Sequence, residues 1–360
     1  MTGMTPRPNA SSRQRGTRGP APTSVANLRD VAARAGVSPA TASRVFAGSP
    51  LVRPDTRERV LAAAEELGYV VNGLAQAMMG RGRRSVAFVA SHMIGPTFAA
   101  MAAGAESVAT EQGNLFIVST TGADVTRERD LLETLREQRA AGILLAGSTA
   151  TGAAVDRRIA EYARDLETIG ARLVLCGHPA VPGVPNVLTV DYDQVGGVRA
   201  AVNHLTAAGH RRIAFAGYEP DKTTPLQRLR GYELGLRDAG LALDPSLVVE
   251  CPNETEPAEH GCRDLLRRTD RPTAVVGLTD GVAIGAYRAA RSLGLAIPGD
   301  VAVVGFDDMP LVVDLTPALT TVRAPFWEVG VRGARLALGL EEATGHVELP
   351  TELIVRQSAP

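Results

Sequence analysis

The side chains best suited to catalysis or metal binding are scattered along this 360-residue sequence rather than grouped in motifs. The six histidines form no pattern that indicates a nucleophile or a metal site. The three cysteines, Cys176, Cys251 and Cys262, fit neither a disulfide framework nor a metal cluster. No P-loop, HExxH, GxSxG or helix-opening GxGxxG motif is present. Asp307 and Asp308 could bind a metal, but a turn at a strand end explains them equally well, so we expect neither an enzyme nor a cofactor.

Polar side chains near the N-terminus suit another kind of chemistry, the recognition of nucleic acid. Arg44 can donate two hydrogen bonds to a guanine edge. The hydroxyl groups of Ser38, Thr41 and Ser43 can hold phosphate, as can the N-terminus of a helix that carries them. This chemistry requires that the four residues share the outer face of one helix.

The surrounding residues predict two short helices joined by a tight turn. The first helix is indicated by apolar residues at i, i+3, i+4 and i+7, which are Leu28, Val31, Ala32 and Ala35. Gly36 follows where a left-handed residue is favoured. Ser38 as N-cap and Pro39 as first helical residue then open a second helix that reaches about Phe46. Such a pair forms a helix-turn-helix, whose second helix can enter the major groove; a plain helical hairpin with a solvated polar face is the alternative.

A third helix is predicted from Pro54 to Gly68. Its apolar residues, Val60, Leu61, Ala64 and Leu67, would close a three-helix core. A core of this size is marginal by itself.

The charge of the chain is divided unevenly. Residues 1–84 hold 13 arginines and five acidic residues, whereas the rest holds 25 basic and 34 acidic residues. This division suggests a head that faces nucleic acid on an acidic body, although a solvated basic arm is the alternative. Residues 1–25 have the composition of a disordered basic tail rather than of a signal peptide. No apolar run approaches the roughly 18 residues of a membrane helix, and we expect a cytoplasmic protein with no membrane partner.

From residue 85 onward, short apolar runs alternate with helical stretches. The candidate strands are residues 85–91, 115–120, 142–147, 172–177, 213–217, 273–278 and 301–306. Apolar strands separated by helices indicate parallel α/β sheets with both faces covered. The pattern restarts near Asp191, which suggests two similar lobes. Ligands of such sheets bind outside the carboxyl ends of the strands.

The N-terminal segment resembles the headpiece of the lactose/galactose-repressor (LacI/GalR) family. The resemblance runs without a gap from Leu28 to Ser85, and the stretches that carry it, at the family's spacing, are LRDVAARAGVSPATASRV and TRERVLAAAEELGYVVNGLA. The resemblance implies a helix-turn-helix domain over 26–71, a hinge over 72–82 and an effector-binding core over 83–360. It also implies a regulator, acting as a repressor, that binds double-stranded operator DNA as a homodimer.

The resemblance assigns DNA contacts residue by residue. Bases are read by Pro39, Ala40 and Arg44, and phosphates are contacted by Asn27, Ser38, Thr41, Ser43, Thr56, Tyr69 and Asn72. Pro39 and Ala40 offer no side-chain hydrogen bond, so their contacts must be apolar, for example to a thymine methyl group. Arg53 replaces the usual capping Ser, which costs its helix about 0.5–2 kcal/mol, and it can reach a phosphate itself.

Residues 72–79 form a candidate hinge helix. Leu74 and Met78 lie at i and i+4 on one face. A segment this short is below the roughly 12 residues that an isolated helix needs, so we expect it to order only when two copies pack on DNA. In the family an apolar side chain from each hinge wedges into the minor groove, and Met78 holds that position here. An ordinary flexible linker is the alternative.

The rest of the chain resembles the family's sensor core, which is like a periplasmic sugar-binding protein. The stretches that carry the resemblance are GHRRIAFAG, RLRGYELGL, DGVAIGAYRAARSLGLAIPGDVAVVGFDD and PALTTVRAPFWEVG. This resemblance implies two lobes with doubly wound parallel sheets, joined by three crossovers near Leu188–Asp191, Leu319–Val322 and Gly345–Pro350. The expected bounds are about 83–189 with 320–347 for the first lobe, and 190–319 with 348–360 for the second.

Three effector contacts carried over from the family have structural alternatives. Arg228 matches the ligand-binding arginine, which would grip hydroxyl groups or a carboxylate, but it could be a surface residue of a helix N-terminus. Asp307 matches a polar cleft residue that accepts from sugar hydroxyls, but it could cap a turn. Phe326 matches an aromatic that stacks on a sugar, but it could serve packing alone.

Other cleft positions depart from the family. Thr279 stands where Asn is usual, Gly177 where many members carry a sugar-binding Asp, and His92 with Met93 where more typical polar contacts occur. Thr224 precedes Arg228 by one helical turn. These departures disfavour a simple hexose and predict a sugar or sugar derivative that is larger, or less hydroxylated, than a free monosaccharide.

Overall fold

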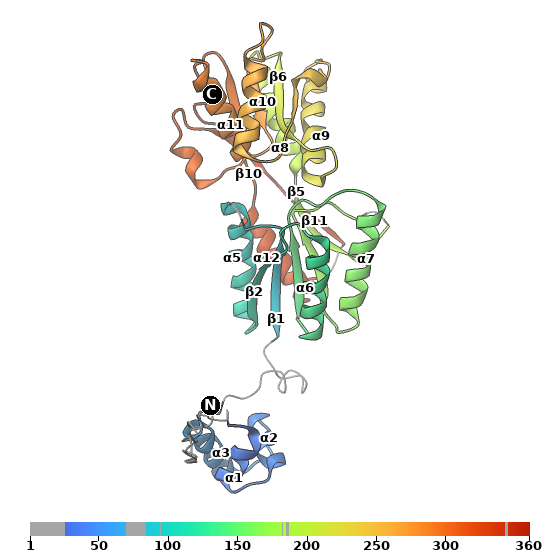
Figure 1. Cartoon of the computed structure of the whole chain (residues 1–360), viewed down its shortest axis with the longest axis vertical. Helices are drawn as coiled ribbons and strands as arrows, with labels where there is room; N and C mark the ends of the chain where they lie inside the picture. The colour runs from blue at the N-terminus through green and yellow to red at the C-terminus, as the bar shows by residue number, and fades with distance from the viewer. Residues whose placement is uncertain (1–25, 70–83, 94, 182, 185–186, 343–344) are drawn as a thin grey trace, which may run out of the picture. The chain divides into compact units, whose positions relative to one another are not determined.

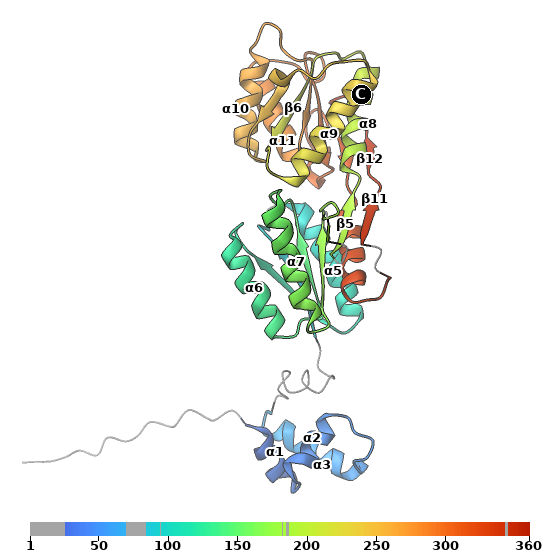
Figure 2. The same cartoon turned by 90° about the vertical axis from the view of Figure 1, so that its right-hand side faces the viewer.

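The computed structural model describes residues 26–69, 84–93, 95–181, 183–184, 187–342 and 345–360. The chain separates into two compact units, Met1–Gly82 and Arg83–Pro360. Figure 1 and Figure 2 show the elements of each unit, which are described separately here. The tail expected over 1–25 and the hinge expected over 72–82 lie outside the described residues.

The first unit is a three-helix headpiece. Its helices are α1 (Leu28–Ala35), α2 (Pro39–Phe46) and α3 (Pro54–Glu66). Asn27 and Asp30 form a capping box at the start of α1, and Gly36 ends this helix at a φ of 67°. Ser38 opens α2 by accepting a hydrogen bond from the backbone N–H of Thr41 at 3.1 Å. The predicted helix, turn and helix are therefore present.

The headpiece core differs from the prediction at one position of α3. Its buried apolar residues are Val31, Ala32, Ala35, Ala42, Val45, Val60, Ala63 and Ala64. Leu61 was predicted to join them and is 49 % exposed, because the buried face of α3 is set by Val60, Ala63 and Ala64. Arg53 stands at the N-cap of α3 and makes no side-chain capping hydrogen bond, as the sequence predicted.

The second unit contains two six-stranded sheets, one in each lobe. The first has the order β11-β5-β4-β3-β1-β2 and comprises β1 (Ser85–Ala90), β2 (Leu115–Thr120), β3 (Gly142–Ala146), β4 (Arg172–Cys176), β5 (Leu188–Tyr192) and β11 (His346–Leu349). The second has the order β12-β10-β9-β8-β6-β7 and comprises β6 (Ile213–Tyr218), β7 (Val248–Glu250), β8 (Ala274–Gly277), β9 (Ala302–Asp307), β10 (Thr320–Arg323) and β12 (Glu352–Ile354). Neighbouring strands are parallel except β12, which is antiparallel to β10. Both sheets are doubly wound, as expected.

Helices cover both faces of each sheet (Figure 1). The first lobe has α5 (Pro96–Glu111) and α12 (Phe326–Ala337) on one face, and α6 (Val125–Glu137) and α7 (Ala153–Glu167) on the other. The second lobe pairs α8 (Gln194–Ala207) with α9 (Thr223–Asp238), and α10 (Thr255–Leu266) with α11 (Asp280–Ser292). Short 3-10 turns, η1 and η2, span Pro245–Leu247 and Pro310–Val313. No helix in the described part of the chain is long and apolar enough to cross a membrane.

Helices α5 and α12 approach so closely that glycine is required at their contact. A Cβ on Gly104 would overlap the carbonyl oxygen of Trp327, and one on Gly330 would overlap that of Met101. This pair brings a helix from the C-terminal part of the chain into the first lobe.

Two of the three crossovers lie a few residues later than predicted, whereas the third follows β11 at the end of the predicted segment Gly345–Pro350. The segment Leu188–Asp191 belongs to β5 of the first sheet, so the chain enters the second lobe only after Tyr192. The segment Leu319–Val322 falls largely in β10 of the second sheet, and the chain returns after Arg323. The predicted lobe limits at 189/190 and 319/320 are therefore too early, because both segments complete a sheet before they leave it.

Candidate functional site

The outer face of α2 presents the residues predicted to read bases. Pro39, Ala40 and Arg44 are exposed, and Arg44 has no side-chain hydrogen bond or ion pair with any described residue. Its guanidinium is therefore available to an external acceptor. The hydroxyl oxygens of Ser38 and Thr41 lie 2.9 Å apart at the start of the same helix.

The remaining predicted DNA contacts surround this face or lie outside the described residues. Asn27 and Arg53 are exposed at the starts of α1 and α3, and Ser43 and Thr56 are half-buried. Tyr69 is half-buried and packs on Phe46, with 5.5 Å between ring centroids. Asn72, Leu74 and Met78 lie outside the described residues.

A cavity of about 700 Å³ lies between the two lobes, at the carboxyl ends of strands from both sheets. All six predicted effector residues line it, namely His92, Thr224, Arg228, Thr279, Asp307 and Phe326. Gly177 also lines it, at a φ of 71°. The volume is within the usual range for small-molecule sites.

Arg228 is the centre of a buried polar network in this cavity. Its residue is 1 % exposed, so it is not a surface residue of a helix N-terminus. Its Nε donates to Gln194 Oε1 at 3.1 Å, and its Nη1 donates to the carbonyl of Leu278. Its Nη2 donates to the hydroxyl of Tyr192 at 3.1 Å and to Asp307 Oδ1 at 3.3 Å. These bonds fix the guanidinium before any ligand arrives.

The face of the same guanidinium is covered by an aromatic ring. The Arg228 Cζ lies 3.6 Å from the centroid of Phe306. A cation over an aromatic face is attracted by the ring quadrupole. Arg228 is thus held at its edges and from one side.

Asp307 ends β9 in an unusual backbone conformation, with a φ of 115°. Backbone in this region is strained for a residue other than glycine, and such strain collects at binding sites. Burial raises the pKa of Asp307, against the opposing effect of Arg228. The pKa of its neighbour Asp280 is raised by burial and by repulsion from Asp307. Asp280 accepts hydrogen bonds from the hydroxyl of Thr321 at 2.5 Å and from the backbone N–H of Met309 at 2.7 Å.

Phe326 and Tyr192 form an aromatic wall of the cavity. Their ring centroids are 5.4 Å apart in an edge-on arrangement, and Phe326 is 9 % exposed. Phe326 therefore packs within the protein and also lines the cavity. Burial raises the pKa of Tyr192 well above its usual value, so its hydroxyl keeps its proton.

Thr279 is engaged by its own neighbours. Its hydroxyl donates to Asn253 Oδ1 at 2.7 Å and accepts from the backbone N–H of Val282 at 3.3 Å, which caps α11. Asn253, from the nearby loop, also lines the cavity, so an amide side chain lies beside Thr279.

Sequence reasoning missed several other residues that line the cavity. They include Phe98, Ser148, Tyr192, Glu219, Lys222, Asn253 and Glu254. Tyr192 is the last residue of β5, and Glu219 directly follows β6. Their position at the carboxyl end of a strand was the signal that could have identified them. Asn253 and Glu254 follow the short strand β7, which the sequence did not reveal. Within the described residues no group of three or more His, Cys, Asp or Glu is placed to hold a metal ion.

The two lobes also touch through loops beside the cavity. The backbone N–H of Thr151 donates to the carbonyl of Asp221 at 2.9 Å, and that of Thr223 donates to the carbonyl of Thr149 at 3.0 Å. The hydroxyl oxygens of Ser148 and Thr223 lie 3.3 Å apart. These bonds join the loop after β3 to the loop after β6.

His178 supports the first of these loops from within the first lobe. Its Nε2 lies 2.5 Å from Thr149 Oγ1, and its Nδ1 lies 2.8 Å from the carbonyl of Pro179. The Nδ1 must donate to that carbonyl, so the Nε2 of the neutral ring accepts from Thr149. Burial lowers the pKa of His178, which favours this neutral form.

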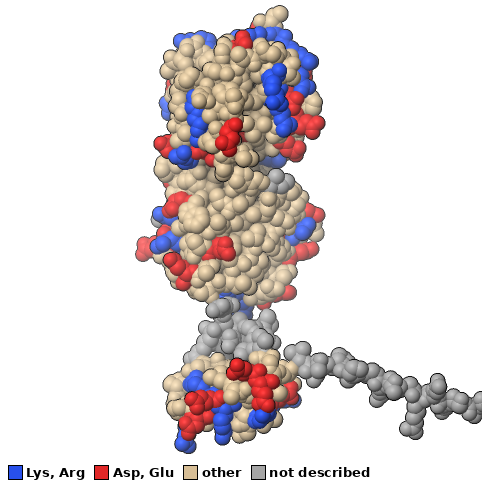
Figure 3. Space-filling view, turned by 90° about the vertical axis from the view of Figure 1, so that its left-hand side faces the viewer, with Lys and Arg blue, Asp and Glu red and all other residues tan. Residues whose placement is uncertain are grey.

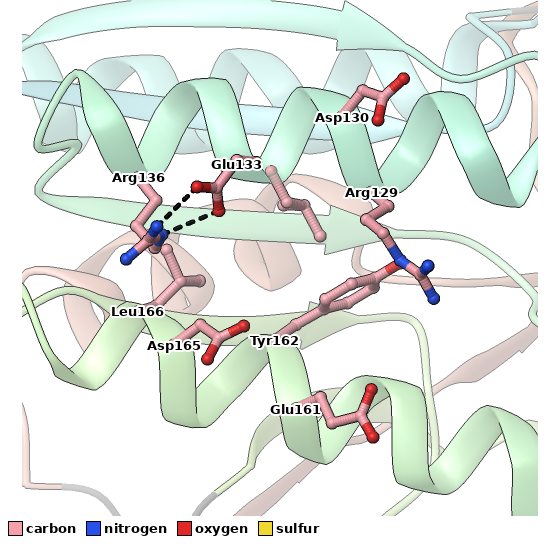
Figure 4. A pocket seen from close by; sticks show the side chains of 9 residues that line it. Arg129, Asp130, Glu133, Arg136, Glu161, Tyr162, Asp165 and Leu166 are labelled. Atoms are coloured by element: carbon pink, nitrogen blue, oxygen red, sulfur yellow. Dashed lines mark hydrogen bonds and ion pairs between the residues drawn. The ribbon is translucent and has the colours of Figure 1, made fainter.

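A separate cavity of about 280 Å³ lies between α6 and α7 and contains none of the predicted site residues (Figure 4). Tyr162 and Leu166 form its apolar side, and charged side chains surround it. Arg136 is already paired there with Glu133 at 2.5 Å. The cavity is distinct from the one between the lobes.

Comparison with known proteins agrees with both halves of this description. Residues 27–72 match the family described as bacterial regulatory proteins, lacI family, and residues 202–359 match a periplasmic binding protein-like domain. The HTH-type transcriptional regulator CelR of Thermobifida fusca is 34 % identical over 335 residues, which cover 91 % of this chain and 95 % of that protein. The chain belongs to the LacI family. Catabolite control protein A of Priestia megaterium is 30 % identical over 337 residues, with 92 % of this chain and 98 % of that protein covered.

Solved structures of this family share the fold. A CelR–cellobiose complex is 33 % identical and superposes with a TM-score of 0.67, covering 92 % of this chain and 99 % of that one. A Lac repressor dimer bound to operator and the anti-inducer ONPF is 26 % identical, with a TM-score of 0.79 and coverage of 93 % and 99 %. This LacI-family protein is therefore a DNA-binding transcriptional regulator.

Proposed function

We propose that this regulator is a cytoplasmic repressor that binds a palindromic operator as a homodimer and is controlled by a sugar-like effector in the inter-lobe cavity. The observation that carries the proposal is the fixed Arg228 network in a cavity formed by the strand ends of both lobes. A ligand there contacts both lobes at once, so it has different affinities for different lobe arrangements. Such differential affinity is what couples a ligand to a distant site.

The headpiece supports the DNA half of the proposal. Arg44 is exposed and unpaired within the described residues, and Pro39 and Ala40 stand beside it on the same helix. Carried over from the sequence, Leu74 and Met78 would form the hinge that wedges into the minor groove. Replacing Met78 by Gly should lower specific operator affinity and leave effector binding intact. If operator affinity is unchanged, Met78 does not insert into the minor groove.

The face that carries α5 and β2 supports the homodimer. Figure 3 shows few charged side chains on this face of the first lobe. Leu115 and Val118 of the edge strand β2 are 59 % and 45 % exposed. In the second lobe we place the helix Val282–Leu293 and its neighbours at the interface, where Leu311 of the adjoining η2 turn is 72 % exposed. A two-fold dimer would cover these residues and match a two-fold operator.

Selection of DNA from a random pool by the full-length protein, at near-physiological salt, tests the proposal first. A palindrome of roughly 14–20 base pairs is expected from two headpieces about one to two helical turns apart. A non-palindromic site, or a site bound by one protomer, would contradict the homodimer. Release of the selected DNA by a sugar is then expected, and release is the direction we favour over co-repression.

A further inference from the structure

The charged side chains that line the inter-lobe cavity leave no arginine or lysine free. Besides the imidazole of His92, the lining contains two basic residues, Arg228 and Lys222, and three acidic residues, Glu219, Glu254 and Asp307. Arg228 is paired with Asp307, and the Lys222 Nζ lies 2.6 Å from Glu219 Oε2. Glu254 has no cationic partner within the described residues. The cavity therefore carries an excess of negative charge.

The geometry of Arg228 excludes the usual way of binding an anion. A carboxylate or phosphate is gripped by two parallel N–H groups on one edge of a guanidinium. The Nε and Nη2 edge is occupied by Gln194, Tyr192 and Asp307, and Nη1 already donates to Leu278. One N–H of Nη1 remains without an acceptor among the described residues. Arg228 can thus complete a hydrogen bond to a hydroxyl group, but it cannot form a bidentate pair without breaking this network.

Lys222 offers an anion no better partner. It is the only lysine of the chain, and Glu219, whose side chain is 19 % exposed, neutralises it inside the cavity rim. An anionic ligand would have to displace Glu219 or lie against it. Glu254, at the start of α10, would repel the same ligand.

We propose that the inter-lobe cavity selects uncharged or amine-bearing polyhydroxyl ligands and rejects phosphorylated or acidic sugars, with Glu219 and Glu254 as the residues that set this selectivity. The inference rests on the proposed function, because it concerns the effector of the same cavity. It resolves the choice, left open by the sequence, between hydroxyl groups and a carboxylate as the partner of Arg228.

Calorimetric titration of the full-length protein with matched sugars tests the inference. The probes are glucose with glucosamine and glucose 6-phosphate, cellobiose with cellobionic acid, and further neutral saccharides with their phosphates or acids. We expect a neutral saccharide to bind at least tenfold more tightly than its anionic counterpart. The amine-bearing counterpart should bind as tightly as the neutral sugar or more tightly. If the added group acted only by steric collision with the cavity wall, the amine-bearing and the anionic counterparts would both bind more weakly than the neutral sugar.

Removing the two carboxylates should reduce the discrimination. In the variant Glu219→Gln/Glu254→Gln, the ratio of neutral to anionic affinity should fall about tenfold, because Lys222 is released and one repulsive charge is lost. Glu256→Gln is the matched control, since Glu256 is exposed on the same helix α10 and does not line the cavity. The control should keep the wild-type ratio.

The outcomes separate the two proposals. If an anionic sugar binds as well as its neutral partner or better, or if the double variant keeps the wild-type ratio, the selectivity inference is wrong and the effector cavity stands. If no saccharide of either charge binds or alters operator affinity, the proposed function fails and the inference fails with it.

Discussion

Two arginines, one in each unit, are placed for recognition in opposite ways. Arg44 lies exposed on α2, with no side-chain partner among the described residues. Arg228 is 1 % exposed and donates to four protein groups. An exposed guanidinium can change its rotamer to reach a phosphate or a base and is desolvated only on binding. A fixed guanidinium offers a small ligand a hydrogen-bond donor whose position is already set. The comparison indicates that charge attracts DNA to the headpiece, while hydrogen-bond geometry selects the ligand in the core.

The largest expected difference between the headpiece and the core is in how strongly salt weakens their ligand binding. Operator affinity should fall by about 10³-fold or more between roughly 50 and 200 mM salt, because several phosphates are neutralised by each headpiece. Affinity for an uncharged sugar should change little, since no ion is released. Parallel titrations of DNA and sugar measure both slopes. A steep salt dependence of neutral-sugar binding would contradict the division of roles.

Removing the buried arginine should have the next largest effect. Arg228→Ala leaves the Asp307 carboxylate buried without its cation, and breaking a buried pair in this way costs about 3–5 kcal/mol. We expect a lower melting temperature of the core and loss of the effector response. Arg230→Ala is the matched control, because Arg230 lies on the same helix and its side chain is 56 % exposed.

A second variant distinguishes binding from stability at this site. Asp307→Asn keeps the side-chain shape and removes the charge. If it retains a folded core and a full effector response, Asp307 only caps its turn. Basal operator binding of the folded fraction should persist in both variants.

Removing the exposed arginine should have a smaller and purely local effect. Arg44→Ala should weaken binding to the selected operator by about 1–3 kcal/mol, the usual value of a bidentate base contact. The preference for one base pair should be lost, and the melting temperature of the core should not change. Arg34→Ala is the control, since the exposed Arg34 pairs with Glu66 away from α2. Equal losses on all DNA sequences would mean that Arg44 contacts only phosphate.

The smallest expected effect is a change in how core stability depends on pH. The pKa of Asp280 is raised by burial and by the nearby Asp307, so the folded state keeps a proton that the unfolded state has lost. The free energy of unfolding should therefore fall as pH rises above about 4, the ordinary value for Asp. Urea unfolding should show this slope in the wild type and a flatter one in Asp280→Asn. The control variant Asp314→Asn, at an exposed position, should keep the wild-type slope. If Asp280→Asn also keeps it, a group other than Asp280 causes the pH dependence.

The sequence predicted the elements whose local signals agree with their tertiary environment. Gly36 after α1, Ser38 and Pro39 at the start of α2, and the seven apolar strands are where the sequence placed them. The short strands β7 and β12 have three residues each, too few to show a pattern. Leu61 was misplaced because the apolar face of α3 is broad, and only packing decides which residues it buries.

The sequence predicted the residues at the centre of the cavity but not those at its rim. Arg228 and Asp307 follow motifs that identify them. Lys222 and Asn253 belong to loops, where no periodicity indicates which side chain turns inward. The hydrogen bond between Asn253 and Thr279 joins segments that are distant in the sequence. The ion pair between Lys222 and Glu219 depends on a local turn that the sequence does not specify.

The hydrogen bonds between the loop after β3 and the loop after β6 bear on the speed of the response. The backbone pairs of Thr151 with Asp221 and of Thr223 with Thr149 must break before the lobes can separate beside the cavity. A ligand that enters by this route waits for an opening event, and such motions occur on the microsecond-to-millisecond scale. The observed association rate should therefore rise with ligand concentration and then level off at the opening rate, so that the protein itself, rather than diffusion, limits how fast it senses a sudden abundance of its ligand.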